Sequence, residues 1–259
     1  MGLSEETFSW RQYLADFHRD RPGVAEAVLS RTLSGDHTPY RWLARAVSPD
    51  ATVVLDVASG SGPMSRELAQ PGRMVIGMDL SSHELGLAAE RGPGPWVQGD
   101  AVALPFADGS VSAVTSSMGL VVATPLGNVL AEISRVLKPG GVLAAIAPAL
   151  RPLGPKDIRV LTRINTRLRT KPQFPAPVEI AGFKRTLLAH GLRRVEDNRE
   201  RYRFTVDNRA DAELMLSALY LPQTRWSRVE SAIELLEDRV AKHGPVEVTI
   251  PMRRVVAIK

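Results

Sequence analysis

Apolar residues fall into two kinds of segment along the chain, short unbroken runs and longer stretches with helical spacing. The clearest junction between them lies at 53–69, where the run Val53-Val54-Leu55 meets small residues and then a helical pattern. An unbroken apolar run suits a strand that is buried on both faces of a parallel sheet. The segment therefore predicts a strand, a tight loop, and a helix that begins near Pro63 and ends near Gln70.

The same two kinds of segment alternate along the rest of the chain. This alternation predicts a Rossmann-like α/β fold with a doubly wound, mostly parallel sheet. Further strands are expected at 73–78, 96–98, 111–116 and 142–147, within 192–206, and at 246–258 with a break at Pro251. Helices are expected at 5–18 with Ser4 as N-cap, and at 22–33, 39–47, 81–91, 125–137, 156–169, 179–190, 209–219 and 225–242.

The order of these elements indicates how the chain is organised. Three helices precede the first strand, so residues 1–48 are expected to form an N-terminal helical cap over one edge of the sheet. Residues 49–259 would form the main domain, and a proline-bracketed basic helix forms an insertion at about 149–180. Aromatic residues in the cap could form one wall of a small-molecule pocket.

Composition narrows the class of protein. The chain has 259 residues, of which 44% are hydrophobic, and it contains no run near the roughly 20 apolar residues that span a bilayer. It begins without a signal-peptide pattern, so we expect a soluble, cytoplasmic protein with no membrane partner. Cysteine is absent, which excludes disulfides, thiolate metal sites and a cysteine nucleophile, and we expect no metal. The net charge of +5 is spread along the chain and predicts an arginine-rich solvated surface.

Candidate chemistry gathers at the carboxyl ends of three successive strands. The loop after the first strand contains Gly60 and Gly62, which permit a sharp turn close to a ligand. Asp79 ends the second strand, about 20 residues later, where it could accept hydrogen bonds from a ribose. Asp100 follows the third strand and could accept from the exocyclic amine of a base. Ligands bind at this edge of open α/β sheets, so the pattern predicts an adenosine site.

In these motifs the chain resembles the class I S-adenosylmethionine-dependent methyltransferases that act on small molecules. The segments that carry the resemblance are 55–62 (LDVASGSG), 77–81 (GMDLS), 99–106 (GDAVALPF) and 132–141 (EISRVLKPGG). The resemblance implies S-adenosylmethionine as cofactor and a seven-stranded sheet that ends in an antiparallel hairpin. It also implies a cofactor site formed by Asp56, Ala58, Ser59, Gly60, Gly62, Asp79, Leu80, Asp100, Ala101 and Ser116.

The chain departs from the family pattern in two places. Val111-Ser112 replaces the usual Phe-Asp at the start of the fourth strand, which we interpret as a change in core packing without catalytic consequence. Ala58 stands where the first glycine of the family's turn is usual, and alanine fits there only if the backbone is not left-handed. A protein that keeps the fold but does not methylate, such as a cyclase or a binding protein, therefore stays a hypothesis.

The resemblance does not supply a general base. Histidine suits proton removal near neutral pH, and tyrosine is a second option. The candidates in the cap are Tyr13, His18, His37 and Tyr40, although an isolated histidine is more often a packing residue.

The substrate is expected to be a small organic molecule, such as a secondary metabolite, methylated at an O, N or C nucleophile. A peptide is the next hypothesis. A nucleic acid such as tRNA ranks last: Arg159, Arg163 and Arg167 recur on one side of a helix, but Ser116-Ser117-Met118-Gly119 replaces the motif of adenine-N6 methyltransferases. The sequence gives no oligomeric state.

Overall fold

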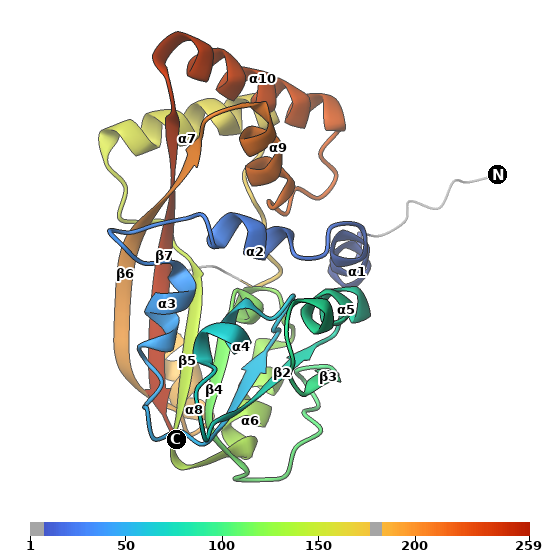
Figure 1. Cartoon of the computed structure of the whole chain (residues 1–259), viewed down its shortest axis with the longest axis vertical. Coiled ribbons are helices and arrows are strands. Elements are labelled where there is room, and N and C mark those ends of the chain that lie inside the picture. Colours follow the sequence, from blue (N-terminus) through green and yellow to red (C-terminus); the bar gives the residue numbers. More distant parts are fainter. Residues whose placement is uncertain (1–7, 177–182) are drawn as a thin grey trace, which may run out of the picture.

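The computed structural model describes residues 8–176 and 183–259, which form one seven-stranded sheet with helices on both faces (Figure 1). The strands are β1 (Val53–Val57), β2 (Met74–Asp79), β3 (Trp96–Gln98), β4 (Val111–Ser117), β5 (Leu137–Pro148), β6 (Arg193–Val206) and β7 (Val246–Ile258). The helices are α1 (Trp10–Asp20), α2 (Val24–Leu29), α3 (Pro39–Ala44), α4 (Pro63–Leu68), α5 (Ser82–Arg91), the 3-10 helix η1 (Gly119–Val121), α6 (Leu126–Val136), α7 (Pro155–Leu168), α8 (Phe183–Ala189), α9 (Arg209–Ser217) and α10 (Trp226–His243).

The strand order is β3-β2-β1-β4-β5-β7-β6. The first five strands are parallel, and β7 runs antiparallel between β5 and β6. This confirms the predicted α/β class, the mostly parallel sheet and the antiparallel hairpin at its end. The order reverses between β1 and β4, so the loops beyond these strands lie where open α/β sheets bind ligands.

Side chains of β1 and β5 alternate between two apolar layers. Leu55 and Val57 of β1 belong to a core with α6 and α8, whereas Val54 belongs to a core with α3 and α4 on the other face. Both layers are therefore closed by helices, which explains why the strands read as unbroken apolar runs.

The hairpin of β6 and β7 extends beyond the rest of the sheet and carries a separate lobe (Figure 1). Here α7, α9 and α10 pack on the ends of the two strands around a core that includes Phe204, Ile233 and Leu236. The lobe combines the helix expected in the insertion at 149–180 with helices from the connection between β6 and β7. Helices α1 and α2 lie between this lobe and the main sheet (Figure 1).

The predicted break at Pro251 is wrong, because β7 is continuous and pairs Pro251 with Arg201. The Pro251 carbonyl accepts a hydrogen bond from the Ala149 N–H at 2.7 Å, so this side of the residue faces the β5 chain just past the end of that strand. An N–H at this residue would point to the same side as the carbonyl, so the hydrogen bonds between β6 and β7 lose no donor at Pro251.

The first helix begins at Trp10, later than expected. Ser9 has an extended backbone, and its Oγ accepts a hydrogen bond from Gln12 N at 3.4 Å, so it is the N-cap. The proposed cap Ser4 lies outside the described residues, as does the expected start of the later helix at Glu179. Within the described ranges, every helix is too short or too polar to cross a bilayer.

Candidate active site

A cavity of about 420 Å³ opens at the carboxyl edge of the sheet. One side is formed by the loops that follow β1, β2 and β3. The other side is formed by α1, α2 and the segment around η1, with Tyr40 of α3 and Tyr220, which follows α9. The N-terminal helices and the segment that follows α9 therefore both contribute to one site at the carboxyl ends of the parallel strands.

The loop after β1 is tightly wound. Ala58, Gly60 and Gly62 have φ values of 56°, 54° and 79°, and Ser59 N donates to Met78 O at 3.0 Å. The backbone at position 58 is thus left-handed. The expectation that alanine fits this position only with a backbone that is not left-handed is therefore wrong. The space that its Cβ needs comes from Gly119, where an added Cβ would lie 2.6 Å from the Cβ of Ala58.

Asp79 ties the loop to β2. Its Oδ2 accepts a hydrogen bond from Gly60 N at 2.8 Å, and its Oδ1 accepts from Ser81 N at 2.9 Å. Burial raises the pKa of Asp79, whereas these two N–H donors act in the opposite direction. An ionised carboxylate has further lone pairs, so Asp79 can still accept hydrogen bonds from a ligand in the cavity.

The loop after β3 forms the far end of the same wall. Asp100 and Ala101 line the cavity together with Leu80. Asp100 Oδ2 accepts a hydrogen bond from Arg11 at 2.8 Å, and Oδ1 accepts from Val102 N at 3.2 Å. The cap thus contacts the carboxylate at this end of the site.

Comparisons with known proteins match this part of the chain. Residues 55–145 match the family model of a methyltransferase domain. A demethylmenaquinone methyltransferase of Renibacterium salmoninarum is 46% identical over 91 residues, 35% of this chain and 38% of that relative. Residues 55–145 are a methyltransferase domain.

Solved structures with the same fold cover more of the chain. A protein of Bacillus halodurans C-125 superposes with a TM-score of 0.60 at 19% identity, covering 85% of this chain and 98% of that one. A phosphoethanolamine N-methyltransferase of Haemonchus contortus, solved with S-adenosylhomocysteine, has a TM-score of 0.58 at 17% identity and covers 98% of this chain and 61% of its own. These similarities confirm the methyltransferase fold.

Within the methyltransferase domain, three of the expected site residues do not line the cavity. Asp56 is fully buried behind the loop, where it accepts hydrogen bonds from Thr115 at 2.9 Å and Ser65 at 3.3 Å. Gly62 packs against Trp96, and Ser116 is buried below the cavity without a hydrogen-bond partner for its hydroxyl. The other expected cofactor residues, Ala58, Ser59, Gly60, Asp79, Leu80, Asp100 and Ala101, all line it.

The structure separates the four candidate bases. His18 and Tyr40 line the cavity, whereas Tyr13 and His37 do not. The Tyr13 hydroxyl accepts a hydrogen bond from Leu221 N at 2.8 Å, and His37 lies 2.9 Å from Glu200 of β6. Burial raises the pKa of Tyr40 well above its ordinary value, so Tyr40 keeps its proton and is a poor base.

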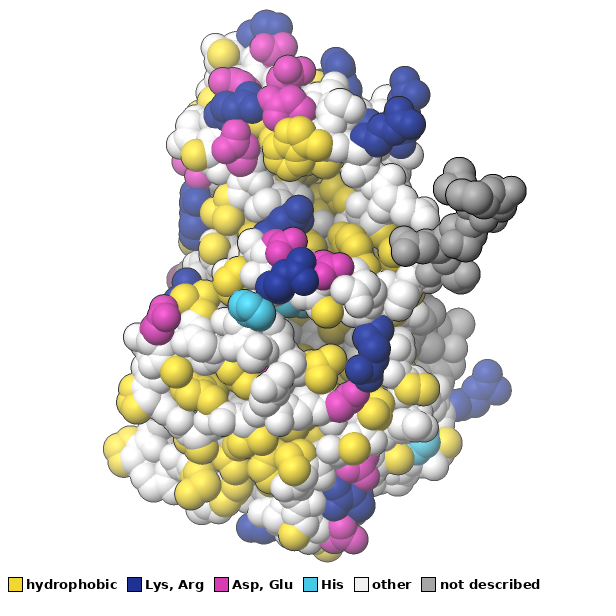
Figure 2. All heavy atoms as spheres, turned by 90° about the vertical axis from the view of Figure 1, so that its right-hand side faces the viewer, with side chains coloured by type: hydrophobic (Ala, Val, Ile, Leu, Met, Phe, Trp, Pro, Cys, Tyr) yellow, Lys and Arg dark blue, Asp and Glu magenta, His cyan; other side chains and the backbone are white. Residues whose placement is uncertain are grey.

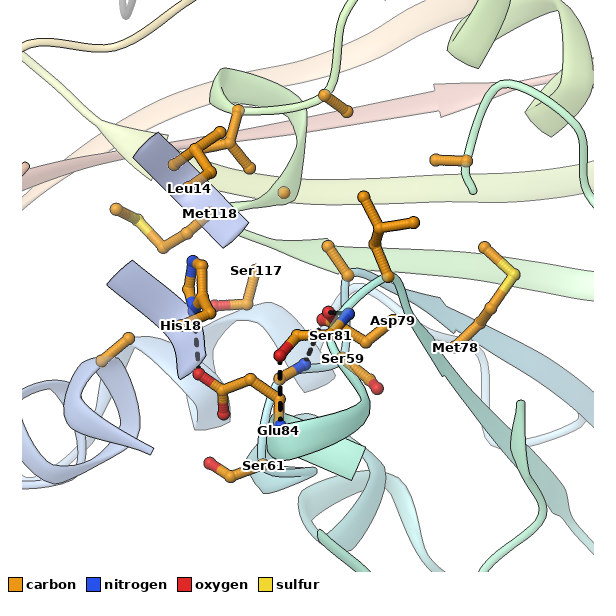
Figure 3. Close-up of a pocket in the computed structure, with 18 of the residues that line it drawn as sticks. Leu14, His18, Ser59, Ser61, Met78, Asp79, Ser81, Glu84, Ser117 and Met118 are labelled. Atoms are coloured by element: carbon orange, nitrogen blue, oxygen red, sulfur yellow. Dashed lines mark hydrogen bonds and ion pairs between the residues drawn. The ribbon is translucent and has the colours of Figure 1, made fainter. Parts of the chain in front are cut away.

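His18 has two partners that the sequence did not single out. Its Nδ1 lies 2.8 Å from Glu84 Oε1 (Figure 3). Its Nε2 lies 2.9 Å from the hydroxyl of Tyr220. Glu84 occupies the first turn of the helix after β2, a position that could have suggested the site. Tyr220 is 202 residues away from His18 in sequence, and no local pattern marks it.

Glu26 is a further cavity residue that the motifs missed. It accepts hydrogen bonds from Ser61 Oγ and Arg66, both at 2.6 Å, and lies 2.6 Å from Arg91. Burial alone would raise the pKa of Glu26, but the bonds from Ser61 and Arg66 outweigh it and the pKa is lowered. The charged Glu26 therefore fastens α2 to the loop of the methyltransferase domain.

The contact between Ala58 and Gly119 gives a first prediction. Gly119→Ala should lower the stability of the fold by about 1–3 kcal/mol, because the new Cβ would lie 2.5 Å from Ser116 Oγ and 2.6 Å from Ala58 Cβ. Combining it with Ala58→Gly should restore part of the loss, because the contact with Ala58 disappears. Thermal unfolding measures both effects. Gly86→Ala, where an added Cβ has no atom within 4 Å, is the control, and an equal melting temperature for Gly119→Ala and Gly86→Ala would contradict the prediction.

Proposed function

We propose that the protein transfers a methyl group from S-adenosylmethionine to an O, N or C nucleophile of a small organic molecule. The observation that carries this proposal is the single cavity that joins the strand-end loops of the methyltransferase domain to the walls formed by α1, α2 and Tyr220. One side of such a cavity can hold a cofactor while the other holds a second molecule next to it.

The residues on the loop side fit S-adenosylmethionine. Ser59 and Ser117 both line the cavity, and the hydroxyl oxygen of each is buried without a hydrogen-bond partner. Asp79 would accept hydrogen bonds from the ribose, and Leu80 and Ala101 would border the adenine. When bound, the cofactor supplies an electrophilic methyl group on a sulfonium sulfur.

The opposite walls favour a flat, apolar substrate. Trp10, Leu14, Met118 and Val122 line this side. Aromatic and aliphatic walls with a few polar groups are typical of small-molecule sites. Several relatives are named demethylmenaquinone methyltransferases and match between about a third and a half of this chain, which supports a small organic substrate as a class.

The charge distribution gives less support to a nucleic acid. Acidic and basic side chains are interspersed on the face that contains α1 and α5 (Figure 2). Of the basic residues on β6, Arg201 and Arg203 lie 3.2 Å from Asp157 and 3.1 Å from Glu247. Such paired arginines leave little net charge for phosphates. Arg159, Arg163 and Arg167 are exposed on α7, in the upper lobe and outside the cavity lining.

Isothermal titration calorimetry with S-adenosylmethionine and with S-adenosylhomocysteine tests the proposal. We expect both to bind at one site per chain. If neither binds to the folded protein, the proposed function is wrong and a role outside methyl transfer has to be sought.

A further inference from the structure

Three side chains from three parts of the molecule meet at the cavity wall. His18 comes from the cap, Glu84 from the methyltransferase domain, and Tyr220 from the segment that follows α9. Figure 3 shows the His18 ring directed toward Glu84. All three line the cavity, and none of them belongs to the motifs that identify the cofactor site.

The hydrogen bonds fix the direction in which a proton can move. Glu84 is 2% exposed, and its Oε2 accepts from Gly23 N at 2.9 Å, so its carboxylate is held in place by the cap. As a carboxylate, Glu84 can only accept through its other oxygen, Oε1, so the bond at 2.8 Å then places a proton on His18 Nδ1. In the neutral ring, Nε2 then carries the lone pair and accepts from the Tyr220 hydroxyl.

Tyr220 itself is suited to pass a proton on. It is 8% exposed, and burial raises the pKa of Tyr220, with further contributions from Asp79, Glu84 and Tyr13. The phenol therefore stays protonated and can lose its proton only while it receives another. Its oxygen can still accept one hydrogen bond from a molecule in the cavity.

We propose that Tyr220, His18 and Glu84 form a proton relay that deprotonates a hydroxyl group of the substrate. This inference rests on the proposed function and specifies its substrate class as phenols or enols. The substrate proton moves to Tyr220 Oη while the Tyr220 proton moves to His18 Nε2, and Glu84 stabilises the resulting imidazolium. The substrate oxygen forms a bond to the methyl carbon, the bond from that carbon to sulfur breaks, and its electron pair stays on sulfur.

The relay distinguishes hydroxyl substrates from amines. A neutral amine already has a free electron pair and needs no base before it attacks the methyl group. A phenol or enol is a far better nucleophile as an oxyanion, so a positioned base accelerates its reaction. The arrangement of a carboxylate, a histidine and a hydroxyl in sequence is the one that activates hydroxyl groups in other enzymes.

Other titratable and charged groups surround the relay. Asp79 of β2 faces His18 and Tyr220 from the cofactor side, and its charge interacts with both. Tyr13 of α1 faces Tyr220, and Arg11 and Arg19 of α1 line the same cavity. A pH profile must therefore be compared between variants of the relay, because Asp79 contributes to the profile of every variant.

The first test needs no substrate. Nitrogen-15 NMR of the histidines, with His18 assigned from its absence in His18→Gln, reports the tautomer at about pH 8. We expect a protonated Nδ1 and an unprotonated Nε2 in the native protein. Protonation of Nε2 alone, or of both nitrogens, would overturn the relay, because Nε2 could then accept no proton from Tyr220.

The second test measures methyl transfer from methyl-labelled S-adenosylmethionine to 1,4-dihydroxynaphthalene, with 1-aminonaphthalene in parallel. Tyr220→Phe and His18→Gln should each lower kcat for the dihydroxy probe about 100-fold and leave cofactor binding unchanged. Glu84→Gln should lower kcat more than it changes KM and should also shift the tautomer of His18. Tyr202→Phe is the matched control, because Tyr202 is a buried tyrosine of β6 that does not line the cavity.

Each result decides between the two proposals. Labelling of the amine but not of the dihydroxy probe, or equal kcat in Tyr220→Phe and the control, overturns the relay and leaves the methyltransferase intact. Cofactor binding without labelling of either probe also counts against the relay. Absence of cofactor binding instead rejects the proposed function.

Discussion

Exchanging Asp56 for asparagine should reduce the dependence of the protein's stability on pH between about 4 and 7. Burial raises the pKa of Asp56 from 3.8 to about 7, against the opposing effect of the Thr115 and Ser65 hydroxyls. The folded state therefore binds a proton that the unfolded state releases in this range. Stability is highest below the unfolded pKa and falls as the pH rises toward 7, by roughly 4 kcal/mol.

The measurement is the free energy of unfolding in urea at a series of pH values. Asp56→Asn should be more stable than the native protein at pH values above about 7, and the difference should vanish toward pH 4. Exposed Asp50, changed to asparagine in the same way, is the control. Parallel curves for the native protein and Asp56→Asn would show that Asp56 is ionised throughout.

Replacing Asp79 by alanine should weaken the binding of S-adenosylmethionine by about 100-fold or more, since charge-assisted hydrogen bonds contribute roughly 1.5–3 kcal/mol each. The variant loses the acceptor proposed for the ribose and also the acceptor for Gly60 N, which positions the loop. Calorimetry gives the affinity, and circular dichroism confirms that the variant is folded. Glu90→Gln, an exposed change on α5, should bind normally. An unchanged affinity of Asp79→Ala would remove Asp79 from the cofactor site.

The sequence predicted the parts of the site that depend on local order. The loop at 58–60, Asp79 and Asp100 follow successive strands of a parallel sheet, so their position at one edge follows from topology alone. The conformation of Ala58 did not follow, because the room for its Cβ is provided by Gly119, which is remote in sequence. Local rules for left-handed residues cannot include such a partner.

The substrate side could not be predicted in the same way. Tyr220 reaches the cavity from a lobe whose position is set by the length of the β6 and β7 hairpin. His18 was one of several equal candidates until Glu84 and Tyr220 distinguished it. A break was predicted at Pro251 because local patterns do not determine strand register. Only the register places this residue beside the end of β5.

The place of β7 in the sheet affects how the protein can be made. This strand is the last in the chain, yet it lies between β5 and β6, which it joins through ladders on both sides. During synthesis β5 is therefore an open edge until residues 246–258 leave the ribosome. Open edges invite pairing with other chains. Synthesis slowed after β6 should consequently increase aggregation, and chaperones that cover exposed strands should have their effect in this interval.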